Sequence, residues 1–218
     1  MAPLVGRAQE LSHIGHLIDG VRDGGSSVLV RGEAGIGKSA LGAAAASRAN
    51  EGGFRVLTTT GVQSETELTF AGPHQLLRPL HGGLVSLPVQ QRNALGSAFG
   101  LVDAGVPELF LIGLASLNLL SETAAAAPLM LIAEDAQWLD RPTCDVLAFV
   151  ARRLASDPIV FLAAIRDGHD TALDKAGISD LRLNGLDHVA AGALVDALSP
   201  DLGLERASDC WRSRRPQP

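Results

Sequence analysis

The chain has 218 residues, of which 46% are hydrophobic and 19% charged, a composition that excludes wholesale disorder. The formal net charge of −6 gives no indication of a nucleic-acid surface, and the only dense basic cluster (Arg212, Arg214 and Arg215) stands at the very end. Two cysteines, Cys144 and Cys210, are too few for a disulfide framework and lack zinc-site spacing, so we expect a reduced, cytoplasmic protein.

The first part of the chain predicts an alternation of helices and strands. Residues 8–22 carry apolar residues at helical spacing, and Asp23-Gly24-Gly25 ends that pattern. The apolar run 26–30 predicts a short buried strand of the kind found inside parallel sheets. Residues 38–50 predict a helix of small residues, and residues 54–60 predict a second strand.

The rest of the chain continues this alternation. Residues 71–126 predict mostly helix, and residues 141–157 predict an amphipathic helix. The helical breaks expected in the middle region lie near Gly82-Gly83, Pro88 and Gly105. Three further apolar runs predict strands: 128–135, 158–167 and 178–186. Strands alternating with helices indicate a parallel sheet covered on both faces.

Neither a signal peptide nor a membrane span is expected. Charge and polarity interrupt the first residues, MAPLVGRAQEL, at once. The most apolar region, LFLIGLASLNLL followed by SETAAAAPLMLIA, is interrupted by Glu122 and Pro128, and neither half reaches the length of a span. We therefore expect a buried helix followed by a buried strand there, and no membrane partner.

A glycine-rich segment predicts a phosphate-binding loop. Residues 32–39, GEAGIGKS, fit the pattern G-x-x-x-x-G-K-[ST] without a mismatch. Glycines let the backbone curl until successive N–H groups face phosphate oxygens, and the helix that begins near Lys38 adds the positive end of its dipole. Lys38 can then reach the β- and γ-phosphates, and the Ser39 hydroxyl can bind Mg²⁺. An ordinary glycine-rich turn is the alternative.

Two carboxylates and one arginine predict the second half of the site. Glu134 and Asp135 follow the apolar strand 129–133, at the sheet edge where ligands of open parallel sheets bind. One can accept the Mg²⁺ water shell, and the other can polarise an attacking water. Arg166 ends the next apolar strand, where its guanidinium could touch the γ-phosphate. The alternatives are a solvated acidic turn and a surface arginine.

Together these segments resemble a known family. The chain looks like the N-terminal ATPase module of the large LuxR-type ATP-binding regulators of actinobacteria, which belong to the signal-transduction (STAND) ATPases of the wider AAA-like class. The resemblance runs from about residue 3 to about residue 205 and includes a middle segment that is not a generic nucleotide-binding pattern. The segments that carry it are LVGRAQEL, VLVRGEAGIGKSAL, GVQSETELTFAGPHQLLRPL, IAEDAQWLDRPTCDVLAFVARRL and LRLNGLD.

The resemblance implies a role for each matching residue. Val5, Gly6 and Arg7 match a box near the adenine, and the acidic pair has Glu134 where the family often has Asp. The residues implied to bind ATP are Val5, Gly6, Arg7, Gly32, Glu33, Ala34, Gly35, Ile36, Gly37, Lys38, Ser39 and Ala40. The residues implied to act in catalysis are Lys38, Asp135 and Arg166, and those implied to bind Mg²⁺ are Ser39 and Glu134.

The resemblance also implies the domain organisation. Residues 1–184 are expected to form a three-layer α/β P-loop NTPase sandwich with a five-stranded parallel sheet, and residues 185–205 to begin a helical lid. Residues 206–218 form an atypical tail. If the arginine codon is of the CGN type, the codons for its Asp-Cys-Trp-Arg, read in a frame shifted by two bases, encode Leu-Leu-Ala. Members of the family that the chain resembles continue for several hundred residues beyond this point. We therefore expect a frameshifted or truncated gene, with a natural short paralogue as the alternative.

Three functions are compatible with these patterns. The first is an ATP-binding, slowly hydrolysing switch module that binds no DNA by itself and could self-associate or bind a protein partner. The second is a P-loop enzyme such as a small-molecule kinase, which would need an acceptor pocket and usually a basic lid. The third is an interaction module with a decayed nucleotide site. The site residues argue against decay, because all four are intact: Lys38, Ser39, Glu134 and Asp135.

Overall fold

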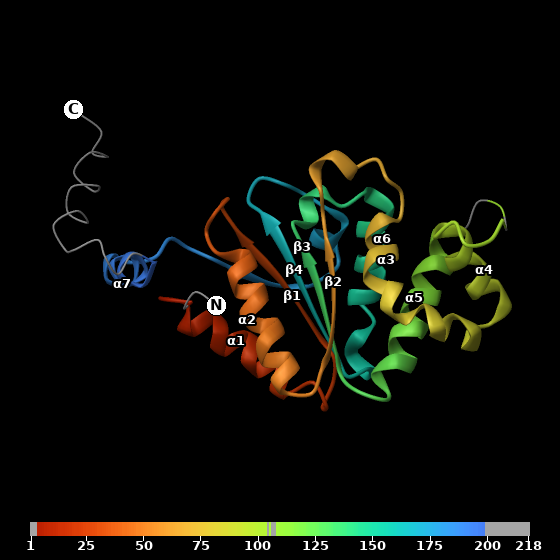
Figure 1. The fold of residues 1–218 in the computed structure, drawn as a ribbon, viewed down its shortest axis with the longest axis horizontal. Coiled ribbons are helices and arrows are strands. Elements are labelled where there is room, and N and C mark those ends of the chain that lie inside the picture. Colours follow the sequence, from red (N-terminus) through yellow and green to blue (C-terminus); the bar gives the residue numbers. More distant parts are fainter. Residues whose placement is uncertain (1–3, 104, 106–107, 199–218) are drawn as a thin grey trace.

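The expected five-stranded parallel sheet is confirmed. The computed structural model describes residues 4–103, 105 and 108–198, and within them five parallel strands pair in the order β2-β3-β4-β1-β5 (Figure 1). The strands are β1 Ser26–Gly32, β2 Arg55–Thr60, β3 Leu129–Glu134, β4 Ile159–Arg166 and β5 Ser179–Arg182. Because all five are parallel, their carboxyl ends meet at one edge of the sheet, which is where the predicted site residues lie.

Helices cover both faces of the sheet (Figure 1). Helices α1 (Ala8–Asp19) and α2 (Lys38–Glu51) cover one face. Helices α3 (Ala71–Leu77), α5 (Leu109–Ala124) and α6 (Arg141–Ala151) cover the other, and α4 (Val89–Ala98) packs on α5. Helix α7 (His188–Leu198) follows β5 within the range expected for the lid, and the predicted tail lies outside the described residues.

The buried strands alternate between the two cores. In β3, Leu129 and Leu131 pack with α3, α5 and α6, whereas Met130 and Ile132 pack with α1 and α2. All four are at most 2% exposed, so this strand is apolar on both faces, as the continuous apolar run predicts. The predicted pair of a buried helix and a buried strand is confirmed as α5 and β3. In the part of the chain that the structure describes, no helix is both long and apolar enough to cross a bilayer.

Several predicted boundaries differ from the structure. Gly82 and Gly83 lie inside a 3₁₀ segment, Arg78–Ser86, so they do not interrupt the helical backbone. Pro88 and Gly105 fall between helices, as predicted. The helix predicted for residues 141–157 ends at Ala151, because the chain turns there to bury Leu154 in a short 3₁₀ segment before β4.

Asp140 joins the starts of two helices near the carboxyl edge of the sheet. Its Oδ1 accepts hydrogen bonds from the N–H of Thr143 at 3.0 Å, which caps α6, and from the N–H of Phe70 at 3.1 Å, just before α3. Its Oδ2 accepts from the Thr143 hydroxyl. Asp140 is 5% exposed, so water cannot replace its carboxylate as the acceptor of these hydrogen bonds. The carboxylate therefore fixes the start of α6 relative to the start of α3.

Replacing this carboxylate tests the junction. Asp140→Ala removes a helix cap and leaves a buried N–H without an acceptor, so we expect the free energy of unfolding to fall by about 1–3 kcal/mol. The measurement is urea denaturation followed by circular dichroism. Asp145→Ala in the same helix is the matched control, and we expect it to stay within about 0.5 kcal/mol of the parent. Equal effects of the two variants would contradict the assigned role.

Candidate functional site

The predicted phosphate loop connects β1 to α2 at the carboxyl edge of the sheet. Gly35 (φ 74°) and Gly37 (φ 106°) adopt left-handed conformations that favour glycine. A Cβ placed on either residue would meet no atom within 4 Å, so the glycines are needed for backbone conformation and not for lack of space. The open space beside them suits a bound phosphate, whose oxygens could accept from loop N–H groups.

Lys38 is held inside this loop by the loop itself. Its Nζ donates to the carbonyl oxygens of Gly32 and Glu33, both at 2.9 Å, and the residue is only 8% exposed. Burial lowers the pKa of Lys38, and the negative charges of Asp135 and Asp167 oppose that shift. A cation held at the loop in this way is placed to exchange carbonyl oxygens for phosphate oxygens.

Glu134 lies on the same side of the sheet as α2. It is the last residue of β3, and its Oε1 would be 3.3 Å from a Cβ added to Gly42 on α2. Ser39 precedes Gly42 by one helical turn, and it is exposed together with Ala40. Burial, followed by the neighbouring Asp135, raises the pKa of Glu134. The two oxygen donors, Ser39 and Glu134, fit a hard cation such as Mg²⁺.

Asp135 is held in an unusual backbone conformation. Its φ of 46° and ψ of 44° are left-handed, which costs a residue other than glycine about 1–3 kcal/mol. Among the described residues, Phe70 is the other non-glycine residue with positive φ. The Asp135 side chain points into the site, since Oδ1 accepts a hydrogen bond from Gln137 at 2.9 Å and its charge acts on Lys38.

The end of β4 completes the edge. Arg166 is exposed, and its positive charge lowers the pKa of Lys38, which places the guanidinium within electrostatic range of the loop. The main-chain N–H of Asp167 donates to the Gly32 carbonyl at 3.2 Å. The structure thus brings Lys38, Glu134, Asp135 and Arg166 together, although they come from three different strands and loops.

Sequence reasoning missed Gln137 and Asp167. Gln137 contacts both Asp135 and the main chain of Arg166, and Asp167 contacts the loop and accepts from Arg182 at 3.0 Å. The sequence did contain one indication of Gln137, because a carboxamide side chain stands two residues after the acidic pair. The pattern could not show the second partner, the main chain of Arg166, because that residue lies on another strand.

The N-terminal box lies against both the loop and α7. Arg7 is 6% exposed and donates from Nη2 to the Ile36 carbonyl at 3.0 Å and from Nη1 to Glu10 at 2.9 Å. Gly6 (φ 72°) approaches α7 so closely that a Cβ would lie 2.5 Å from the Ala190 Cβ. Val5 is half-buried in the same turn. Residues expected near an adenine are therefore beside the phosphate loop.

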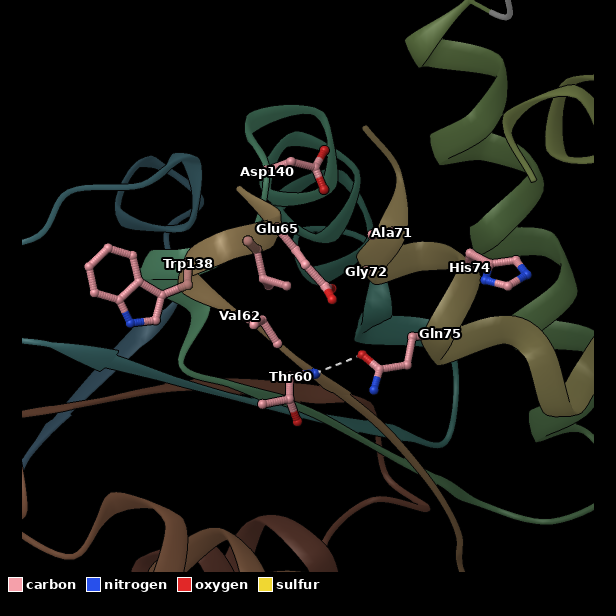
Figure 2. Close-up of a pocket in the computed structure, with 11 residues that line it drawn as sticks. Thr60, Val62, Glu65, Ala71, Gly72, His74, Gln75, Trp138 and Asp140 are labelled. Atoms are coloured by element: carbon pink, nitrogen blue, oxygen red, sulfur yellow. Dashed lines mark hydrogen bonds between the residues drawn. The ribbon is translucent and has the colours of Figure 1, made fainter. Parts of the chain in front are cut away.

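A cavity of about 370 Å³ lies between the segment after β2, the start of α3 and residues 138–140 (Figure 2). Its walls come from the end of β2, the start of α3 and the segment after β3. Its charged lining residues in the described chain are Glu65 and Asp140, with no lysine or arginine among them, so it does not suit a triphosphate. Gln75 is fixed in one wall, because its Oε1 accepts from the Thr59 hydroxyl at 2.9 Å and the Thr60 N–H at 3.0 Å.

The chain is similar to known proteins in sequence and in fold. The profile of the AAA ATPase domain family matches residues 3–162, which includes the phosphate loop and the acidic pair but stops before Arg166. An uncharacterized protein of Rhizobium meliloti (strain 1021) is 28% identical over 248 residues, covering 96% of this chain. The chain spans 23% of the length of that relative.

Two solved structures share the fold at low identity. One is a chain of the E. coli MS115-1 HORMA:CdnC:Trip13 complex, with a TM-score of 0.61 and 14% identity over 99% of this chain and 75% of that one. The other is a signal transduction ATPase with numerous domains (STAND) and a tetratricopeptide repeat sensor from Pyrococcus horikoshii. Its TM-score is 0.52 and its identity 16%, over 97% of this chain and 28% of that one.

Removing the lysine charge tests the loop. We expect Lys38→Ala to weaken Mg-ATP binding by at least about tenfold, or about 1.4 kcal/mol, in calorimetric titration, because it removes the loop's cation. Lys175→Ala, at the other lysine of the chain, is the matched control and should bind like the parent. Ser39→Ala should weaken binding more with Mg²⁺ than without it. A Lys38→Ala variant that binds Mg-ATP as the parent does would refute the assignment.

Proposed function

Because the chain belongs to the AAA ATPase domain family, we propose that it binds ATP with Mg²⁺ and hydrolyses it slowly, as the nucleotide-switch module of a regulator. One observation carries the proposal: Lys38, Glu134, Asp135 and Arg166 converge on the carboxyl edge of the sheet beside a glycine-rich loop. Phosphoryl transfer depends on positioning and charge stabilisation of this kind.

Each residue then has a distinct role. Lys38 neutralises the β- and γ-phosphates, and the loop N–H groups hold their oxygens. Ser39 and Glu134 would hold Mg²⁺, which would supply charge neutralisation for the phosphates. Asp135 orients and polarises the attacking water, and Arg166 contacts the terminal phosphate. Val5, Gly6 and Arg7 lie on the adenine side, between the loop and α7.

We further propose that the regulator is of the LuxR type with a STAND ATPase module. The motifs of the chain resemble that group, and the middle segment that carries much of the resemblance contributes Gly61, Val62 and other residues to the walls of the cavity. Two of the matched proteins, the Rhizobium relative and the Pyrococcus STAND ATPase, are much longer than this chain. Such a context supports a module that reports its nucleotide state to other domains.

A small-molecule kinase remains the second candidate, on one observation. The cavity lined by Thr60, Gln75 and Asp140 is large enough for a small acceptor (Figure 2). A kinase would transfer the γ-phosphate to a ligand in that cavity, whereas a switch would transfer it only to water. Measuring phosphate release with and without candidate alcohol or amine acceptors separates the two functions.

Calorimetric titration of the full chain with Mg-ATP, Mg-ADP and Mg-GTP tests the proposed function. We expect both adenine nucleotides to bind, and Mg-GTP to bind at least about tenfold more weakly. Absence of binding by Mg-ATP and Mg-ADP would overturn the proposal. Equal binding of Mg-GTP would overturn the adenine assignment alone.

Turnover should be slow and should depend on Asp135. As a switch module, the chain should hydrolyse ATP well below the ~1–100 s⁻¹ of kinases. Asp135→Asn should lower even this rate while leaving ATP binding largely intact, because asparagine tolerates the left-handed backbone but cannot act as a base.

Release of labelled phosphate measures the rate, and Asp103→Asn, at an exposed aspartate, is the matched control. Glu134→Gln should instead reduce Mg²⁺ dependence and binding together. Fast hydrolysis that is unchanged by Asp135→Asn would mean that the acidic pair has been wrongly assigned.

A further inference from the structure

Gln137 makes two hydrogen bonds that connect the ends of two strands. It lies in the 3₁₀ turn Ala136–Trp138 that follows β3. Its Nε2 donates to Oδ1 of Asp135 at 2.9 Å, and its Oε1 accepts from the main-chain N–H of Arg166 at 3.0 Å. The side chain therefore spans from the second carboxylate of the acidic pair to the last residue of β4.

A carboxamide is matched to these two partners. An ionised carboxylate only accepts hydrogen bonds, and a main-chain N–H only donates. The side chain between them must therefore donate with one atom and accept with another. This requirement also fixes the orientation of the amide group of Gln137. A glutamate would keep the bond from Arg166 but set a second negative charge against Asp135.

The surrounding contacts hold Gln137 in place. The N–H of Trp138 donates to the Asp135 carbonyl at 2.9 Å, which closes the turn. The Trp138 ring packs edge-on against His169, with ring centroids 5.4 Å apart, and His169 follows β4. Gln137 is thus part of a closed turn whose next residue, Trp138, packs against the segment that follows β4.

The same strand end also contacts the phosphate loop. Asp167, next to Arg166, donates its N–H to the Gly32 carbonyl at 3.2 Å, and that carbonyl also accepts from Lys38. Contacts therefore run without interruption from the loop, through the end of β4 and Gln137, to the Asp135 carboxylate. A displacement of the β4 end would move the Gln137 carboxamide and, with it, the carboxylate.

We propose that Gln137 is a positioning residue that ties the Asp135 carboxylate to the end of β4, so that water activation depends on Arg166 meeting a terminal phosphate. This inference rests on the proposed ATPase function. It assigns no contact between Gln137 and the nucleotide. Gln137 acts only through Asp135 and the main chain of Arg166.

Substitution of Gln137 in the full chain tests the proposal. We expect Gln137→Leu and Gln137→Glu each to lower single-turnover hydrolysis of Mg-ATP by roughly 10–100-fold, the loss typical of a misplaced catalytic group. The dissociation constant for Mg-ADP should stay within about twofold of the parent, because ADP lacks the phosphate that Arg166 contacts. Gln91→Leu is the matched control, since Gln91 accepts from Asn118 at 2.9 Å on helices away from the site.

The outcomes separate this proposal from the proposed function. Parent-like hydrolysis by either Gln137 variant would overturn it while leaving the ATPase function standing. A parallel loss of Mg-ADP affinity and of melting temperature would also overturn it, because it would reveal a merely structural role. If the parent chain fails to bind Mg-ATP, both the proposed function and this inference are overturned.

Discussion

The carbonyl oxygen of Gly32 is the contact on which the site depends. It accepts hydrogen bonds from Lys38 Nζ at 2.9 Å and from the N–H of Asp167 at 3.2 Å. This is possible because β1 lies beside β4 in the sheet, with Gly32 in register with Arg166. The order of the strands therefore brings the phosphate loop and the end of β4 to one point.

The acidic pair is held from the opposite side by the segment after β2. The N–H of Gly61 donates to the Glu134 carbonyl at 2.8 Å, and a Cβ on Gly61 would lie 2.3 Å from the Asp135 carbonyl oxygen. Only glycine allows this approach. Asp135 is thus confined between Gly61 on one flank and Gln137 on the other. Such confinement explains how a left-handed aspartate persists in the folded chain.

The features that could be predicted are those encoded locally. Buried strands appear as apolar runs, and the phosphate loop follows from glycine and lysine spacing within residues 32–39. The bridge made by Gln137 and the bond from Arg7 to Ile36 join residues far apart in sequence, so no pattern could reveal them. The early end of α6 likewise follows from tertiary packing, since Leu154 is buried by a turn and not by continued helix.

The close approach of Gly6 to Ala190 packs two segments that are distant in sequence directly against each other. A turn near the amino end and a helix after the last strand touch with no room for a single methyl group. The docking of α7 therefore depends on the position of the N-terminal turn. The next residue of that turn, Arg7, donates a hydrogen bond to the phosphate loop. A ligand that binds the loop more tightly when α7 is docked would therefore stabilise the docked helix, and by thermodynamic linkage docking of α7 would raise the affinity for that ligand by the same factor.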